Sequence, residues 1–310
     1  MRKAPLPEHL RTGSFSLRAA DKAGVSRTRT EAKDLVTVSR GIRMHLASEA
    51  SGADALRAYT ELDDASVLAV ASAARILQAC LPVWLERDWR IHVARRRGFS
   101  MPRRVNVVGH LLTLLPGEVI ECDGVRLTSP ARTWLDLASI LTVDELVVAG
   151  DSLVCSHGPD FPRPREPMCT VEDLRAAIAR HPGMRGIRNA RSAVELVRVG
   201  SDSQPETRMR LHLIRSGLPE PVLNHVVTGV SGRPVLWPDA ASPAQRVAVQ
   251  YEGSHHNAAD QYLRDIRRAD VAAEQGWLEV RVSKFDLAGE RPAVVGKVRA
   301  ALQSRGWRAR

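Results

Sequence analysis

Short apolar stretches separated by serine and glycine open the chain and predict two small helices followed by a hairpin. Ser16 is a good helix cap, and the helix that it predicts runs to Ala23. After a glycine, Ser26 caps a second predicted helix over residues 27 to about 35. A β-branched run with an Arg-Gly turn follows and predicts the hairpin. This order is typical of a winged helix-turn-helix.

The middle of the chain mixes apolar helical stretches with short β-branched segments. Residues 66–82 and 127–154 carry the helical patterns, and residues 104–112 read as a hairpin-like pair of strands. Together they predict a mixed α+β domain. The longest apolar stretch is interrupted by Arg75 and contains a proline, so it predicts a buried core and no membrane span.

The last third follows a different pattern, with strands enclosed by helices. An amphipathic helix is predicted from residue 204 to Gly217, and apolar strands are predicted over 222–229, 233–241 and 246–253. A helix over 261–277 then leads into a final strand over 278–283. The order α, β, β, β, α, β predicts an α/β core. Before it, the proline-rich residues 156–167 predict an exposed linker.

The length of 310 residues is about twice that of a usual domain, which supports several compact units. We therefore expect an α/β multidomain protein. Its predicted parts are a winged helix-turn-helix over 1–46, a mixed α+β middle domain over 47–155, a proline-rich linker with helices over 156–201, and an α/β core over 202–310.

The excess of positive charge lies at the two ends of the chain. Residues 1–46 hold ten Lys or Arg against four Asp or Glu, and residues 202–310 hold sixteen against twelve. The formal net charge is +10. A basic surface can simply keep a protein in solution, but on a helix-turn-helix it favours binding to DNA.

The four cysteines are scattered, with no CxxC pair and no histidine at zinc-finger spacing, so we expect no structural zinc. No apolar segment of a secretory signal follows the first residues, and the expected compartment is the cytoplasm.

Five basic residues are the predicted DNA contacts of the N-terminal segment. Three belong to the second helix and two to the wing, where they can reach phosphates: Arg27, Arg29, Lys33, Arg40 and Arg43. The alternative is a protein-docking module whose basic face is only solvated.

This segment and the motifs of the middle domain, including SVLAVASAARILQACLP and LTSPARTWLDLASILTVDELVVAGDSLV, resemble the AbiEi-type antitoxins, a family of bacterial transcriptional regulators. The resemblance implies a DNA-binding regulator that works with a toxin partner or as a homodimer.

Acidic residues of the C-terminal third are placed for metal chemistry. Asp239 and Glu252 are thirteen positions apart, far enough for a turn and an antiparallel return that bring both carboxylates to one sheet edge. Such a pair favours Mg²⁺ or Mn²⁺, which can activate a water against a phosphodiester. Glu206 on the first helix and His256 beyond the last carboxylate complete the group of candidate catalytic residues.

The ordered series PD, apolar strand, E-G-x-x-H, D-x-x-R helix and G-W resembles the Vsr-like endonuclease domains of the PD-(D/E)XK restriction-endonuclease fold. By that resemblance Asp239 and Glu252 would hold the metal, Glu206 would order the site, and His256 would transfer a proton. Asp265 and Arg268 would position the histidine or contact DNA phosphate.

One position departs from the pattern of that family. Where an acidic residue is usual, two positions before Glu252, this chain has Gln250, which keeps an oxygen ligand but loses a charge. The leading hypothesis is a Mg²⁺-dependent DNA endonuclease, with metal ligands Asp239, Gln250 and Glu252. The alternative is a non-catalytic DNA-binding regulator of the antitoxin type, and RNA remains a third substrate class, although only 4% of residues are aromatic and could stack on bases.

Overall fold

A computed structural model describes residues 4–253 and 268–309 of the chain. The chain divides into two compact units, residues 1–140 with 176–187 and residues 141–175 with 188–310. Both units combine helices with small β-sheets, so the predicted α/β multidomain class is confirmed. No helix among the described residues is long and apolar enough to cross a membrane.

The first unit begins with small elements around one apolar cluster. They are α1 (Glu8–Arg11), β1 (Ser14–Ser16), α2 (Leu17–Lys22), α3 (Arg27–Thr30), β2 (Leu35–Ser39) and β3 (Ile42–His45). The strands form an antiparallel sheet in the order β1-β3-β2. Phe15 and Leu10 are almost fully buried between this sheet and the helices. Ser16 and Ser26 cap α2 and α3 as predicted.

The second predicted helix is shorter than expected. It ends at Thr30 after a single turn, and the chain enters β2 at Leu35. The β-branched residues that follow are favoured in a paired strand, and their pairing with β3 outweighs continuation of the helix. The strand β1 was not predicted.

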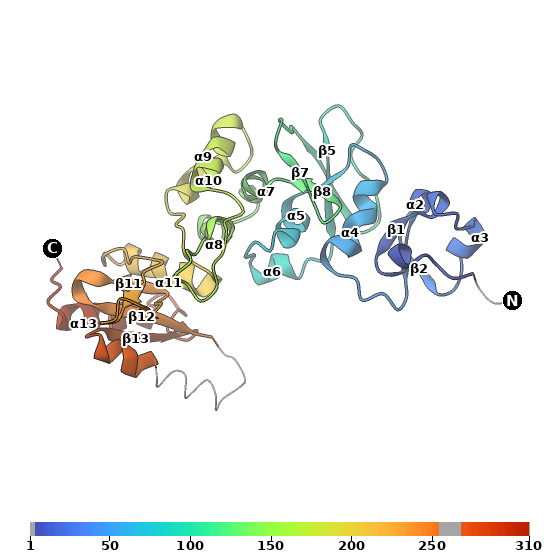
Figure 1. Cartoon of the computed structure of the whole chain (residues 1–310). Coiled ribbons are helices and arrows are strands. Elements are labelled where there is room, and N and C mark those ends of the chain that lie inside the picture. The colour runs from blue at the N-terminus through green and yellow to red at the C-terminus, as the bar shows by residue number, and fades with distance from the viewer. Residues whose placement is uncertain (1–3, 254–267, 310) are drawn as a thin grey trace. The chain divides into compact units, whose positions relative to one another are not determined.

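The rest of the first unit contains a five-stranded sheet and several helices (Figure 1). Its elements are α4 (Gly52–Glu61), β4 (Val67–Leu68), α5 (Val70–Ile76), α6 (Val83–Glu86), β5 (Ile91–Arg96), β6 (Val107–Leu112), β7 (Val119–Cys122), β8 (Val125–Thr128) and α7 (Pro130–Leu137). The strand order is β6-β5-β4-β8-β7. The predicted hairpin within residues 104–112 is wrong, because this segment is one strand, β6, that pairs in parallel with β5.

The second unit contains a helical part and an α/β part. The helices are α8 (Val143–Val154), α9 (Val171–Arg180) and α10 (Ile187–Val194). Residues 176–180 of α9 belong to the first unit. The α/β part consists of α11 (Gln204–Arg215), β9 (Val227–Thr228), β10 (Pro234–Leu236), β11 (Ala240–Ser242), the 3-10 turn η1 (Pro243–Gln245), β12 (Val247–Glu252), helical residues 268–274, β13 (Leu278–Ser283) and α13 (Ala293–Ser304).

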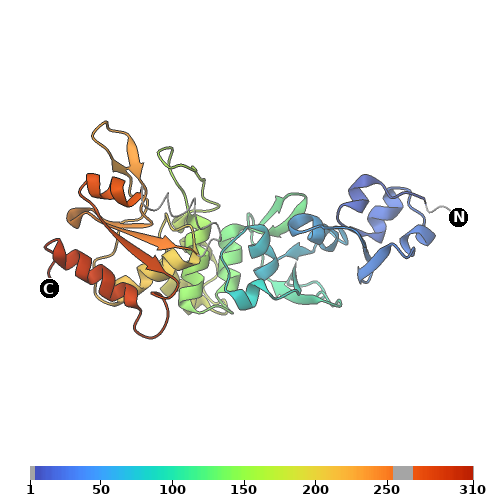
Figure 2. The ribbon, with the colours of Figure 1, turned by 90° about the horizontal axis from the view of Figure 1, so that it is seen from below.

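A sheet in the order β11-β12-β13 is the centre of this α/β part. β11 pairs antiparallel with β12, and β12 pairs in parallel with β13. On one face Val249 and Val282 pack with apolar residues of α11 and α13, which lie side by side (Figure 2). On the other face Ala248 packs with Trp277 and with residues of the β9–β10 hairpin. The predicted strand over 233–241 is wrong, because this segment divides into β10 and β11, which belong to different sheets. Among the described residues four strands therefore lie between α11 and the helical residues 268–274 where three were predicted, and α13 adds a helix that was not predicted.

Candidate functional site

The two predicted metal ligands nearest in space are Asp239 and Gln250. Asp239 precedes β11, and the antiparallel register pairs Ala240 with Val249, which places Asp239 opposite Gln250. The Gln250 Nε2 donates to Asp239 Oδ1 at 2.8 Å, and the Tyr251 backbone N–H donates to Asp239 Oδ2 at 2.6 Å. Both oxygens of the carboxylate are therefore held in place by β12.

Glu206 lies in the first turn of α11, beside the same carboxylate. Its side chain accepts hydrogen bonds from the Ser203 hydroxyl at 2.7 Å and from the Asp202 N–H at 2.8 Å. The Glu206 N–H, one of the first N–H groups that have no partner within the helix, donates in turn to the Ser203 hydroxyl at 3.5 Å. Glu206 is thus fixed at the beginning of α11.

Glu206 and Asp239 hold their protons unusually tightly. Burial, and then the negative charge of Asp239, raise the pKa of Glu206 to about 7. Burial raises the pKa of Asp239 to about 6, although the Tyr251 N–H and the Arg268 guanidinium act in the opposite direction. When both carboxyl groups are ionised, their negative charges repel each other, and a bound cation would reduce this repulsion.

Glu252 lies two positions after Gln250 on β12, so both side chains leave the same face of the sheet. Its carboxylate lies 3.4 Å from Arg281 Nε and 3.9 Å from Arg268 Nη2. Among the described residues its Oε1 accepts no hydrogen bond, although it is buried. The Glu252 Oε1 atom can therefore accept a hydrogen bond from a further donor or bind a cation.

Glu279 on β13 extends this charged face. It pairs with Arg268 at 2.7 Å and with Arg281 at 3.3 Å, and its side chain is only 7% exposed. The parallel register pairs Gln250 with Arg281, so the charged residues of β12 and β13 occupy neighbouring positions. The result is a surface where carboxylates and guanidinium groups alternate.

The structure thus places Glu206 and Asp239 close enough to interact through charge, and Gln250 in direct contact with Asp239. Glu252 and Arg268 lie together on the same face of the sheet. His256 and Asp265 lie outside the described residues. The sequence reasoning did not identify Glu279 or Asp202. Glu279 could have been found from its two-residue spacing to Arg281 on a strand, whereas no sequence signal marks Asp202.

The predicted DNA contacts of the first unit differ in their accessibility. Lys33 and Arg40 are exposed, and Arg27 is exposed and paired with Asp21. Arg43 is partly buried, and its Nε donates to the Thr30 carbonyl at 2.9 Å.

Arg29 does not lie on the exposed face that the sequence predicted. It is 9% exposed, and its guanidinium makes two hydrogen bonds to Asp34, at 3.0 and 2.9 Å, and one to the Ala4 carbonyl at 2.6 Å. The reason is the early end of α3, which turns this side chain back onto its own loop. Arg29 stabilises the local fold, and its guanidinium is not accessible to DNA.

Comparison with known proteins gives two relatives, one from each of two strains of Mycobacterium tuberculosis, both called uncharacterized proteins. Each is 28% identical over 178 residues, which is 57% of this chain and 61% of the relative. The chain thus spans about three fifths of the length of the curated relatives it matches. No family model matches the chain. No solved structure matches it either.

Proposed function

We propose that the protein is a DNA-binding protein whose C-terminal α/β part hydrolyses phosphodiester bonds with the help of Mg²⁺ or Mn²⁺. One observation carries the proposal: Asp239 accepts a hydrogen bond from Gln250 and acts on Glu206 through its charge. Glu252 follows two positions after Gln250 on the same face of β12. This arrangement agrees with the Vsr-like and PD-(D/E)XK resemblance of the sequence.

The residues fit a hard divalent cation. Mg²⁺ prefers oxygen ligands, and this site offers the carboxylates of Asp239 and Glu252 and the amide oxygen of Gln250. Burial is the main cause of the raised pKa values of Glu206 and Asp239, and a bound cation would favour the ionised form of both carboxyl groups. When bound, such an ion lowers the pKa of a water ligand and stabilises the charge of the leaving oxygen.

Three neighbouring groups supply the rest of the chemistry. Glu206, whose pKa is near neutral, can accept a proton from the attacking water at a carboxylate oxygen. Arg268 and Arg281 lie beside Glu252 and can hold a phosphate through paired N–H donors. His256, the candidate proton donor, lies outside the described residues.

The first unit supports the proposed contact with DNA. We interpret α2, α3 and the β2–β3 hairpin as a winged helix-turn-helix, with Lys33 and Arg40 as exposed phosphate contacts. Arg27 would exchange its ion pair with Asp21 for a phosphate.

A non-catalytic DNA-binding regulator of the antitoxin type is the second candidate. It is favoured by the hydrogen bond between Gln250 and Asp239, because an amide donor there satisfies the carboxylate without a metal. In that case the α/β part would act only as a binding module.

A plasmid assay separates the two functions. The full chain is incubated with supercoiled plasmid and Mg²⁺ or Mn²⁺, with and without chelator, beside Asp239→Asn. Asparagine keeps an oxygen that accepts the Tyr251 N–H, so the fold should persist, whereas we expect cleavage to fall at least 100-fold. Arg308→Gln, an exposed change in the same unit, should cleave like the unchanged protein.

DNA retention measured by gel shift on the same samples completes the test. Unchanged DNA binding with no metal-dependent cleavage by the wild-type protein would favour the regulator. Equal cleavage by Asp239→Asn and the wild type would remove Asp239 from the site.

A further inference from the structure

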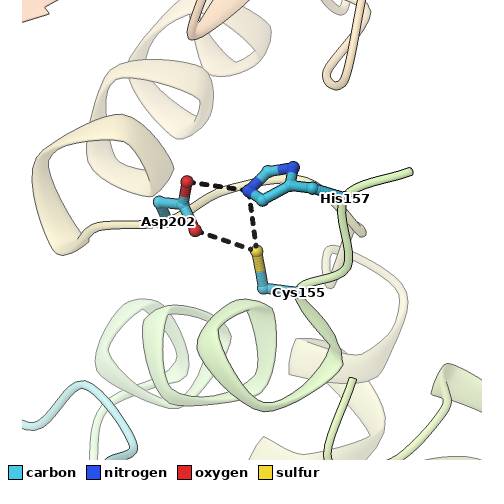
Figure 3. A group of neighbouring side chains, drawn as sticks. All are labelled: Cys155, His157 and Asp202. Atoms are coloured by element: carbon cyan, nitrogen blue, oxygen red, sulfur yellow. Dashed lines mark hydrogen bonds and ion pairs between the residues drawn. The ribbon is translucent and has the colours of Figure 1, made fainter. Parts of the chain in front are cut away.

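A second group of side chains with metal-binding chemistry lies at the junction of α8 and α11 (Figure 3). Cys155 caps the C-terminus of α8, His157 follows two positions later, and Asp202 lies just before α11. The Cys155 Sγ, one nitrogen of His157 and the carboxylate of Asp202 point toward a common centre, all within 4.8 Å of one another. Neither Cys155 nor His157 belongs to the catalytic group described above.

The histidine is held in one tautomer by its second nitrogen. Asn224 donates its amide Nδ2–H to the Ser156 carbonyl at 2.8 Å, which turns its Oδ1 toward His157 Nδ1 at 2.6 Å. Since Oδ1 can only accept, Nδ1 must be the donor. Gly200, with φ +108°, lies directly against this amide, where a Cβ would be 2.6 Å from Asn224 Cγ. Metal-binding histidines are commonly oriented by such a second partner.

This arrangement leaves His157 Nε2 facing two acceptors. It lies 2.7 Å from Asp202 Oδ2 and 3.6 Å from Cys155 Sγ, and the thiol lies 3.3 Å from Asp202 Oδ1. A nitrogen lone pair and a carboxylate at this separation repel each other unless a proton or a metal ion lies between them. The centre therefore requires a positive species.

We propose that Cys155, His157 and Asp202 bind a borderline transition-metal ion, with Zn²⁺ as the best match. A thiolate, a carboxylate and a neutral imidazole together carry a charge of −2, equal and opposite to that of the ion. Zn²⁺ accepts this mixture of sulfur, nitrogen and oxygen ligands, whereas Mg²⁺ prefers oxygen alone. Three protein ligands leave a fourth position for water.

The distances agree with a tetrahedral ion after a small movement. With Zn–S near 2.3 Å and Zn–N near 2.0 Å, the sulfur and nitrogen of a tetrahedral site are about 3.5 Å apart. Cys155 Sγ and His157 Nε2 are 3.6 Å apart. The carboxylate must move away from the imidazole by roughly 0.6 Å to reach its own position in the same geometry. Asp202 is 52% exposed and can make this movement, and it leaves a path for the ion to reach the site.

Binding proceeds with a clear proton balance. The ion displaces two protons to solvent, the Cys155 thiol proton and the proton that lies between His157 Nε2 and Asp202 in the metal-free protein. The Asp202 carboxylate is already ionised, and His157 binds through Nε2 with its Nδ1 proton retained. Arg165, which lies 3.2 Å from Asp202 Oδ1, must give up this contact. Its Nη2 keeps its bond to the Ser152 carbonyl at 2.9 Å.

Cobalt substitution tests the site directly. The full chain is dialysed against chelator and titrated with Co²⁺ and then with Zn²⁺. We expect a thiolate-to-cobalt charge-transfer band that saturates at one Co²⁺ per chain and is lost when Zn²⁺ displaces the cobalt. Cys155→Ser should lose the band and bind Zn²⁺ at least about 100-fold more weakly, whereas Cys169→Ser, a matched cysteine change in the same unit, should bind like the wild type.

Two further variants keep the test decisive. Asn224→Ala should weaken Zn²⁺ about 10- to 100-fold while the band persists at saturation, because it removes only the second partner of His157. Asp239→Asn should retain the band in full, which separates this site from the proposed catalytic one. Absence of the band in the folded wild-type protein, or its persistence in Cys155→Ser, would overturn the proposal.

Discussion

Gln250 decides how the candidate catalytic site behaves without a metal. Its amide donates to Asp239 Oδ1 and so stabilises the ionised carboxylate, whereas the raised pKa of Asp239 reflects burial. A glutamate in this position would exchange a donor for a second negative charge about 2.8 Å from the first. The residue therefore balances the stability of the metal-free protein against affinity for a cation.

We predict that Gln250→Glu lowers the melting temperature in chelator and raises it in Mg²⁺ by more than the wild type gains. Repulsion between the two carboxylates costs roughly 1–2 kcal/mol without the ion, and relief of this repulsion should tighten Mg²⁺ binding about fivefold. Thermal unfolding in chelator and over a Mg²⁺ series measures both effects. Gln250→Met serves as the uncharged control, and a similar Mg²⁺ response in both variants would contradict a metal site here.

The pKa of Glu206 gives a prediction for pH. Because its pKa in the folded protein, about 7, lies above the value of an exposed glutamate, the protonated form is the one that the fold favours. Its contribution to stability is therefore complete at acidic pH and is lost as pH rises through about 7. In chelator, the wild type should lose more stability between pH 5.5 and pH 8 than Glu206→Gln, by about 1 kcal/mol.

Thermal melts of both proteins at the two pH values check this difference. Asp136, a buried carboxyl group of the first unit, also has a raised pKa and should contribute equally in both proteins, whereas Asp239 interacts with Glu206 through its charge and belongs to the measured difference. An identical pH dependence in the two proteins would mean that Glu206 titrates normally.

At the scale of elements, a buried ion pair joins α8 to α11. Asp151 and Arg210 are both fully buried, with Asp151 Oδ2 2.7 Å from Arg210 Nη2. The Thr207 hydroxyl donates to the same oxygen at 2.9 Å, and the Arg198 N–H donates to the other at 2.8 Å. Burial of two charges is tolerated because hydrogen bonds satisfy the carboxylate from three sides.

Arg210→Met should therefore destabilise the second unit by about 3–5 kcal/mol, because it leaves the Asp151 carboxylate buried without its cation. Denaturant unfolding followed by tryptophan fluorescence measures this destabilisation. Arg208→Met, on the exposed side of the same helix, is the matched control and should change stability by less than about 0.5 kcal/mol. If the two variants unfold at the same denaturant concentration, the pair contributes little.

At the scale of the whole molecule, the uneven charge of the chain predicts how DNA binding depends on salt. Lys33 and Arg40 belong to the first 46 residues, where ten basic residues face four acidic ones, and both are exposed. Removing one cation that binds a phosphate flattens the slope of log affinity against log salt by roughly 0.9. The double variant Lys33→Ala, Arg40→Ala should thus reduce the slope by roughly 1.8.

The double variant Arg87→Ala, Arg308→Ala controls for net charge, since both residues are exposed and lie outside the first 46 residues. We expect its slope to match the wild type. Equal slopes for all three proteins would indicate that the N-terminal segment docks to protein instead of DNA.

Local sequence determined those features that depend on neighbours in the chain. The caps at Ser16 and Ser26, the hairpin turn at Gly41 and the elements α11, β12 and β13 follow from capping chemistry, conformational freedom and hydrophobic period. The antiparallel return that the sequence predicted is present between β11 and β12, and it places Asp239 opposite Gln250.

The tertiary structure alone decided which side chains lie together across long separations in sequence. Arg29 is buried against Asp34 and the Ala4 carbonyl, and β6 pairs in parallel with β5 after a connection that crosses to the same end of the sheet. Cys155 and His157 meet Asp202 across more than forty positions, and no spacing rule anticipates a contact that depends on how α8 packs against α11. Packing free energy is a sum over the whole unit, so such contacts cannot be derived from a local pattern.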